Sequence, residues 1–239
     1  MTCFAVGAYV FAISAVHVHR LVAIGAAIGA TAFVYLAVAR VCQAADNDTY
    51  ALAMLAVHLA IIGVITNMRE VTGGAHGLRQ IVAIFDRRSA EVLGLAILVI
   101  GILTATVYLL RSSRGLTLYA VGDDLAWSES LGIPSGRILL IAAFCSGAVV
   151  GLAGALYAAH SQYISPDRFT VLEAISVAGV AMMFPRKPLV TVAFAACALV
   201  LIPEMLRFLP WTAATGANAR RMVFCAFLML SALRINVQR

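Results

Sequence analysis

Long apolar runs recur along the whole chain of 239 residues, and no other feature constrains its fold as strongly. Each run approaches the roughly 20 residues that a helix needs to cross a bilayer. Hydrophobic residues make up 63% of the sequence and charged residues 12%, whereas soluble domains average about 45–50% and about 25%. The sequence therefore predicts a polytopic membrane protein and excludes a soluble domain on a single anchor.

The runs predict an all-α, polytopic transmembrane helical bundle with about seven or eight membrane segments. A chain in lipid must satisfy its own backbone hydrogen bonds, and the alternating pattern of a barrel is absent. Together they form a single transmembrane domain over residues 1–239, with the most hydrophilic connection at 111–137. The runs cover residues 2–18, 21–39, 50–67, 90–110, 138–159, 169–184, 188–206 and 222–235.

The formal net charge of +6 does not indicate a nucleic-acid partner. The basic residues lie singly or in pairs between apolar runs, where lipid headgroups suffice as partners, and they form no basic stripe interleaved with aromatics. With residues 111–137 placed in the cytoplasm, these cations divide almost evenly between the two sides, so the positive-inside rule sets no orientation. The five cysteines lack any metal-ligand spacing and are expected to be small core residues.

Small residues recur at helical spacing in two of the runs. In residues 138–159, one face carries Gly147, Gly151 and Gly154. Gly25 and Gly29 repeat the pattern in residues 21–39. Such faces let helix backbones approach closely in lipid, where the hydrophobic driving force is missing. Both are therefore predicted to be helix-packing surfaces.

The segment 111–137 contains a short helix whose two ends are readable. Asp123 or Asp124 can cap its N-terminus, residues 125–131 can wind, and Gly132 followed by Pro134 can stop it. Trp127 and Leu131, four residues apart, would form one apolar edge. A helix this short is marginal alone, so it is expected to lie against its own protein or in a groove of a partner.

Four motifs, in order along almost the whole chain, resemble the permease subunits of branched-chain amino acid ABC importers, the LivM-like branch. Residues 4–9 are similar to the family's "F-x-x-G-A-Y" and residues 72–78 to its "T-G-G-x-x-G-L". The hydrophilic segment is similar to a cytoplasmic loop that ends in "S-L-G-I". Residues 153–158 and 164–169 then match "A-G-A-L-Y-A" and "I-S-P-x-x-F".

This resemblance implies a permease of the bacterial inner membrane that works with a second permease, two cytoplasmic ATPases and a periplasmic substrate-binding protein. The chain itself would be no enzyme and bind no cofactor, because ATP and Mg²⁺ would be held by the ATPases. The coupling helix that contacts the ATPase would comprise Asp123, Asp124, Leu125, Ala126, Trp127, Glu129, Leu131 and Gly132. The substrate route or the contact with the binding protein would include Thr72, Gly73, Gly74, Gly77, Ser165, Pro166 and Asp167.

Other functions are weighed against this one. No phosphate-binding loop is present, since the only lysine, Lys187, follows Arg186. An ion-coupled secondary transporter would need buried ionisable residues, for which His58 and Glu173 are the candidates. The spacing required for an intramembrane protease or a metal site is absent.

The sequence departs from the family pattern in three places. Val121 and Gly122 replace a basic residue and a carboxylate, and residues 184–187 replace its "G-G-x-G" turn. The extra helices with which family members begin are not expected in this sequence, which starts inside the "G-A-Y" segment. A shortened permease that serves in assembly therefore stays an alternative.

Overall fold

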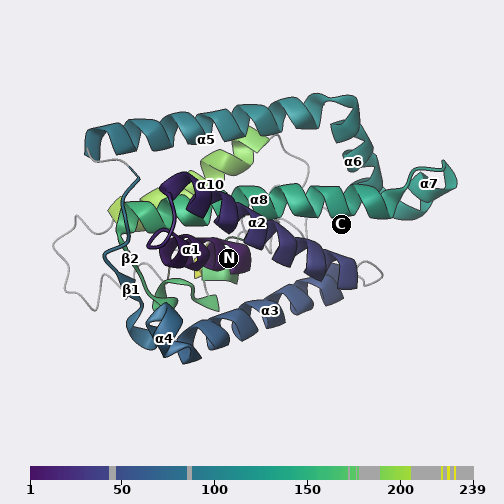
Figure 1. The fold of residues 1–239 in the computed structure, drawn as a ribbon. Helices are drawn as coiled ribbons and strands as arrows, with labels where there is room; N and C mark the ends of the chain where they lie inside the picture. The colour runs from purple at the N-terminus through teal and green to yellow at the C-terminus, as the bar shows by residue number, and fades with distance from the viewer. Residues whose placement is uncertain are drawn as a thin grey trace. The chain divides into compact units, whose positions relative to one another are not determined.

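The computed structural model describes residues 1–42, 47–84, 88–171, 173–175, 177, 189–205, 222, 225, 226 and 229. The described residues are mostly helical, which confirms the predicted helical class (Figure 1). The chain divides into two compact units, Met1–Phe169 and Thr170–Arg239, and each is considered by itself. The single domain expected over residues 1–239 stays a prediction.

The first unit holds most of the described structure. Its elements, in chain order, are α1 (Thr2–Ser14), α2 (Arg20–Val41), α3 (Asn47–Asn67), α4 (Arg69–Thr72), the 3₁₀ turn η1 (Gly74–His76), β1 (Leu78–Arg79), α5 (Arg88–Arg111), α6 (Ser113–Asp123), α7 (Leu125–Ser130), α8 (Ser135–Ser161), β2 (Tyr163–Ile164) and the 3₁₀ turn η2 (Pro166–Arg168). The second unit contributes α10 (Leu189–Met205). The predicted runs 169–184 and 222–235 lie largely outside the described residues.

Three described helices are long and apolar enough to cross a membrane: α2, α8 and residues Leu93–Arg111 of α5. A fourth candidate is the pair Leu52–Asn67 and Arg69–His76, which is bent by 83°. The first apolar run, predicted over residues 2–18, is shorter in the structure because α1 has 13 residues and ends at Ser14. At 1.5 Å per residue it is about 20 Å long, less than the bilayer core. The expected seven or eight segments are therefore not confirmed.

The core of the first unit forms where α1, α2 and α8 pack side by side (Figure 1). The buried side chains are mostly small. Six alanines are 0% exposed: Ala5, Ala8, Ala23, Ala27, Ala155 and Ala158. Glycines close the remaining distance. A Cβ at Gly7 would lie 2.8 Å from the Gly151 Cα, and one at Gly147 would lie 3.0 Å from the Thr31 carbonyl oxygen. The three helices thus approach at backbone distance.

The small residues of α2 that pack are not the predicted ones. A Cβ at Gly25 or Gly29 would meet nothing within 4 Å among the described residues, and both glycines are exposed. Ala23, Ala27 and Thr31 form the packed stripe instead. The prediction of a packing face at Gly25 and Gly29 is therefore wrong for this part of the chain, because glycine spacing alone does not say which side of a helix meets a neighbour.

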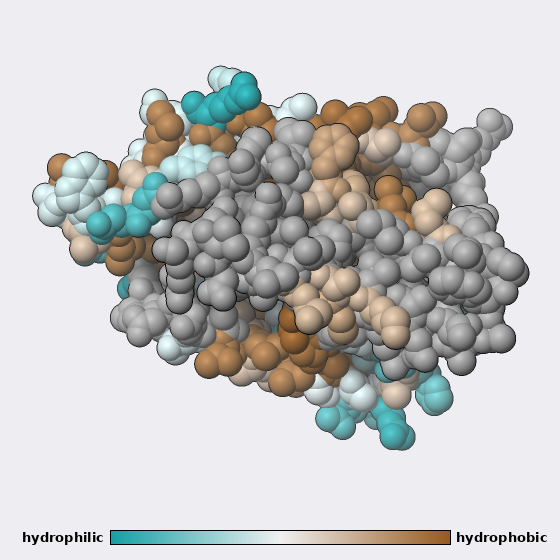
Figure 2. Space-filling model, turned by 180° about the vertical axis from the view of Figure 1, so that it is seen from behind, coloured by the Kyte–Doolittle hydropathy of each residue, from teal (hydrophilic) through white to brown (hydrophobic). Residues whose placement is uncertain are grey.

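Large apolar side chains cover the outside of the described helices. On α5, no residue of Leu93–Arg111 is buried, and Leu93 and Ile97 are well exposed. Figure 2 shows hydrophobic side chains over much of the described surface of one face, with hydrophilic ones gathered toward its ends. This distribution suits a helix surrounded by lipid tails, and it supports an integral membrane protein.

We expect Gly151→Ala to destabilise the first unit. The new methyl would lie 2.7 Å from the Thr31 Cβ, and the Thr31 hydroxyl is already fixed by donation to the Ala27 carbonyl at 2.8 Å. Overpacking of this kind costs about 1–3 kcal/mol. Gly25→Ala is the matched control, which gains helix propensity without a clash. Thermal unfolding in detergent should show a lower Tm for Gly151→Ala only; equal Tm values for the two variants would contradict the packing.

Candidate functional site

Two motifs that are far apart in the sequence meet at one end of α8. β1 pairs with β2 in an antiparallel ladder, with Leu78 opposite Ile164 and Arg79 opposite Tyr163. The hydroxyl of Tyr163 donates to the His76 carbonyl at 3.2 Å. The Arg79 guanidinium lies 5.7 Å from the centroid of the Tyr163 ring, within reach of a cation–π contact. The segments 72–78 and 164–169 are therefore one structural site, which we call the paired-turn site.

The glycine-rich half of this site depends on backbone conformations that other residues adopt rarely. Gly73, Gly74 and Gly77 have φ values of +71°, +59° and +70°. Thr72 is buried, and its hydroxyl lies 2.5 and 2.7 Å from the carbonyl oxygens of Ile65 and Met68, which share its one donor proton. The hydroxyl oxygen also accepts from the Gly74 amide at 3.3 Å. Thr72 thus ties the turn back to the end of α3.

Gly77 lets the turn touch the second motif. A Cβ there would collide with the Ile164 carbonyl and would lie 2.8 Å from the Ser165 Cα. Ser165 and Pro166 are buried beside it, whereas Asp167 is exposed. The predicted residues of the substrate route therefore lie together, and Asp167 presents its carboxylate to the surroundings. Their role stays a prediction.

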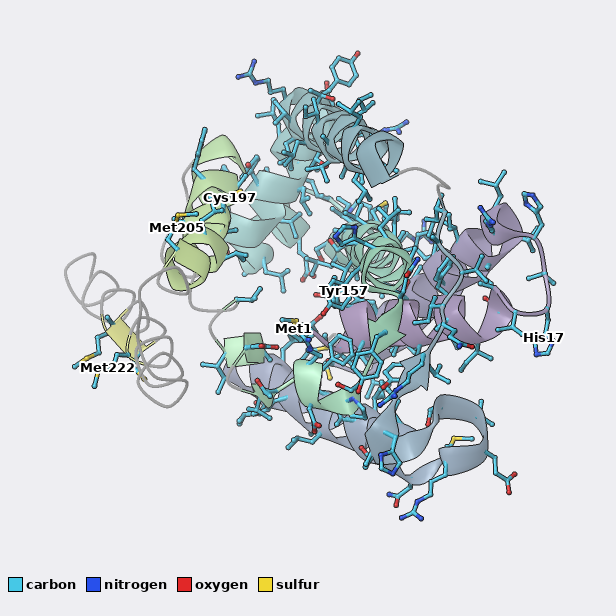
Figure 3. The ribbon with its side chains drawn as sticks, turned by 90° about the vertical axis from the view of Figure 1, so that its left-hand side faces the viewer. Met1, His17, Tyr157, Cys197, Met205 and Met222 are labelled. Carbon is cyan, nitrogen blue, oxygen red and sulfur yellow. The ribbon has the colours of Figure 1, made fainter. Side chains whose placement is uncertain are left out.

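An aromatic cluster fixes the paired-turn site to the helices. Phe169 is 2% exposed, and its ring centroid lies 6.0 Å from that of Phe4 and 6.2 Å from that of Tyr9. Tyr157 of α8 lies beside the first turns of α1, with its ring centroid 5.3 Å from Phe4 (Figure 3). The aromatic positions of the first and last motifs therefore meet in one cluster, which sequence spacing did not indicate.

His58 of α3 contacts this cluster through a hydrogen bond to the backbone of Phe169. It is 2% exposed, and its Nε2 lies 3.1 Å from the Phe169 carbonyl oxygen. Since a carbonyl only accepts, Nε2 carries the proton and donates. His58 thus holds the residue that follows η2. Among the described residues, no group of three His, Cys, Asp or Glu side chains is placed to hold a metal ion.

The predicted short helix is α7. The cap falls on Asp124, whose Oδ1 accepts from the Trp127 amide at 2.9 Å. The helix ends before Gly132, which has a φ of +77°. Asp123 instead ends α6, a helix that was not predicted within 111–137. Leu125, Ala126 and Glu129 are exposed along α7.

The apolar edge of α7 has no cover within the described residues. Leu125 is 45% exposed, Trp127 64% and Leu131 60%. Ser128, on the other side, is 1% exposed, and the carboxylate of Glu129 accepts from the Ser135 hydroxyl at 2.5 Å. One side of α7 therefore packs on its own protein, while Trp127 and Leu131 form an exposed apolar edge.

α7 and the paired-turn site lie at opposite ends of α8 (Figure 1). α8 has 27 residues, so at 1.5 Å per residue it is about 40 Å long and spans a bilayer core. Its glycines Gly147, Gly151 and Gly154 lie against α1 and α2. The two candidate sites therefore lie at opposite ends of a helix that is long and apolar enough to cross a membrane.

These features indicate a helical integral membrane protein. A family model described as "Branched-chain amino acid transport system / permease component" matches residues 2–233. The chain belongs to this family, whose members are transport permeases and not enzymes.

Curated relatives match part of the chain. It is 34% identical over 99 residues to the high-affinity branched-chain amino acid transport system permease protein LivM of Escherichia coli strain K12. The LivM protein of Salmonella typhimurium strain LT2 matches with the same identity and length. Each match covers 41% of this chain and 23% of the relative. No solved structure matches the chain.

Gly77→Ala should disrupt the paired-turn site. The substitution strains a positive φ and forces β1 away from the Ile164 carbonyl, at a cost of about 1–3 kcal/mol. Gly132→Ala controls for strain alone, because it shares a positive φ but has open space around it. Hydrogen exchange should accelerate at Leu78 and Ile81 in Gly77→Ala only. Unchanged exchange there would contradict the pairing.

Asp124→Ala should loosen α7 without affecting α8. The loss of the cap to the Trp127 amide costs about 1 kcal/mol. Amide exchange of residues 125–130 should rise roughly fivefold, which is that energy expressed as an equilibrium constant. Asp123→Ala is the comparison, because Asp123 does not cap α7. An equal rise in both variants would show that the cap is not what holds α7.

Proposed function

We propose that the chain is the membrane-spanning permease subunit of an ATP-driven ABC importer for branched-chain amino acids or related small polar solutes. The supporting observation is α7, a capped helix with an uncovered apolar edge. It is too short to cross a bilayer, and its exposed Trp127 and Leu131 form the kind of apolar edge that a partner covers. In this proposal, a protein partner covers that edge.

In this proposal the partner at α7 is a cytoplasmic ATPase. The cap at Asp124 and the contact between Glu129 and Ser135 hold α7 as a rigid peg, and Trp127 with Leu131 would sit in a groove of the ATPase. Nucleotide-driven closure of two ATPases could then be transmitted to α8 as a rigid-body movement. ATP and Mg²⁺ would be bound by those subunits, and a second permease would complete the pathway.

The paired-turn site would face the periplasm of a bacterial inner membrane. Its exposed Asp167 and the turn from Thr72 to Gly77 would contact the substrate-binding protein or border the substrate route. The relatives are named for high-affinity transport of branched-chain amino acids, and this supports leucine, isoleucine and valine as substrates. We also infer a single permease domain over residues 1–239 with seven or eight segments.

Trp127→Ala should weaken the ATPase contact. Loss of a tryptophan anchor typically costs about 2 kcal/mol or more, which is roughly 30-fold in affinity. Recovery of the ATPase subunit that co-purifies with the wild-type chain should fall accordingly, and so should ATP-dependent uptake of labelled leucine in proteoliposomes. Phe33→Ala, at a 70% exposed aromatic of α2, is the control and should retain both.

Two results would overturn the proposed function. One is co-purification and uptake that survive Trp127→Ala at the wild-type level. The other is leucine uptake driven by a proton gradient with no ATPase present, which would favour an ion-coupled transporter. Uptake of urea or short amides in place of leucine would change the substrate and leave the coupling intact.

A further inference from the structure

Two glutamines of the paired-turn site have a backbone conformation that glutamine rarely adopts. Gln80 follows β1 and has a φ of +60°, and Gln162 follows α8 and has a φ of +52°. Among the described residues, no other side chain than these two is attached to a backbone of positive φ. Outside glycine this conformation is found chiefly in Asn, Asp and His, because Cβ crowds the backbone. Both glutamines therefore cost stability.

The two glutamines lie opposite each other. The ladder of β1 and β2 pairs Arg79 with Tyr163, so its next antiparallel position places Gln80 opposite Gln162. The Ile81 amide donates to the Gln162 carbonyl at 3.3 Å, which holds the two backbones together at this point. The two side chains therefore leave the backbone from neighbouring positions, and we call them the glutamine pair.

The same chain uses glycine at its other described positions of positive φ. At Gly73 and Gly77 a Cβ would collide with the backbone, so only glycine fits. At Gly132 a Cβ would meet nothing within 4 Å among the described residues, and the residue is still glycine. An open turn of this conformation therefore needs no side chain. Glycine would also relieve the strain at Gln80 and Gln162, so the local fold gives no reason for glutamine there.

The side chains of the glutamine pair do not support the fold. Gln80 and Gln162 are both exposed, and neither carboxamide has a hydrogen-bond partner among the described residues. Neither side chain belongs to the aromatic cluster around Phe169. Strained residues that the packing does not require occur preferentially at functional sites. The strain therefore points to a contact of these side chains with another molecule.

The chemistry and the place of the glutamine pair favour a protein over a lipid. A carboxamide offers a donor and an acceptor and carries no charge. A lipid phosphate only accepts and an ammonium only donates, whereas a polypeptide backbone offers both groups at nearly every residue. Gln162 also follows the last residue of α8, which has 27 residues and is, at about 40 Å, longer than the bilayer core. The pair is thus placed to meet a soluble protein.

We propose that Gln80 and Gln162 bind the backbone of an exposed loop of the soluble protein that docks on the paired-turn site, the substrate-binding protein of the importer. This inference rests on the proposed function and adds to it the residues that make the contact. Each carboxamide donates to a carbonyl and accepts from an amide of the loop. The paired backbones of β1 and β2 hold the two carboxamides next to each other before the partner arrives, which lowers the entropic cost of docking.

The experiment measures docking and stability on the same variants. The probe is the purified leucine-binding protein of the source bacterium, and its Kd for the full chain, with the subunits that co-purify with it, is measured in nanodiscs and in detergent. The double variant Gln80→Gly with Gln162→Gly should bind about tenfold more weakly, because two neutral hydrogen-bonded contacts are lost. Its Tm should stay unchanged or rise, because the backbone strain is relieved. A weaker contact in a chain that is no less stable is the expected result.

The matched control is the double variant Gln80→Asn with Gln162→Asn. Asparagine keeps the carboxamide and tolerates a positive φ better than glutamine does. This variant should therefore equal the glycine variant in Tm and bind the probe more tightly than the glycine variant does.

Three results would overturn the inference. The first is wild-type affinity in the glycine variant. The second is a lower Tm in the glycine variant, which would show that the glutamines hold the fold. The third is a loss of affinity in nanodiscs that disappears in detergent, which would assign the contact to lipid. All three leave the ATPase contact at Trp127 untouched and the proposed function standing, whereas a wild-type chain that does not bind the probe would contradict both.

Discussion

The close approach of α8 to α1 and α2 is the contact on which the rest of the first unit depends. Lipid tails are as apolar as leucine, so burial of large side chains gives these helices no reason to associate. Their contact comes instead from Gly7, Gly147, Gly151 and the alanines around them, which allow dispersion contacts along the backbone. Because α8 is fixed in this way, everything attached to its two ends acquires a defined position.

Each end of α8 continues into a site of different character. At one end, a turn of three glycines with positive φ is closed by backbone pairing and sealed by the Phe4, Tyr157 and Phe169 rings. At the other, α7 is held by local polar contacts and leaves Trp127 outside. The first site is thus built from distant segments and rigid, and the second is built from neighbours in the chain and open to a partner.

The features that could be predicted from the sequence are those set by residues close together in the chain. A cap at Asp123 or Asp124 and a stop at Gly132 are signals within ten residues of each other, and the structure has the stop and places the cap on Asp124. The register of Leu78 against Ile164 could not be predicted, since two-residue strands carry no period. Gly25 and Gly29 were predicted to pack against a helix and do not do so among the described residues. A small-residue pattern identifies a face of a helix, but it does not identify the neighbour that the face meets. The length of α1 was overestimated for a similar reason: Ala15 to Val18 are apolar apart from His17, yet they turn away after Ser14.

The paired-turn site can form only late in the synthesis of the protein. Tyr163 and His76 are 87 residues apart, and ribosomes add about 5–20 residues per second. For several seconds the glycine turn therefore exists without β2, after α3 has been made and before α8 has emerged. The last motif to be synthesised is the one that locks the first, because Phe169 contacts both Phe4 and Tyr9. The contacts of Phe169 with Phe4 and Tyr9 can therefore form only after α8 has been synthesised.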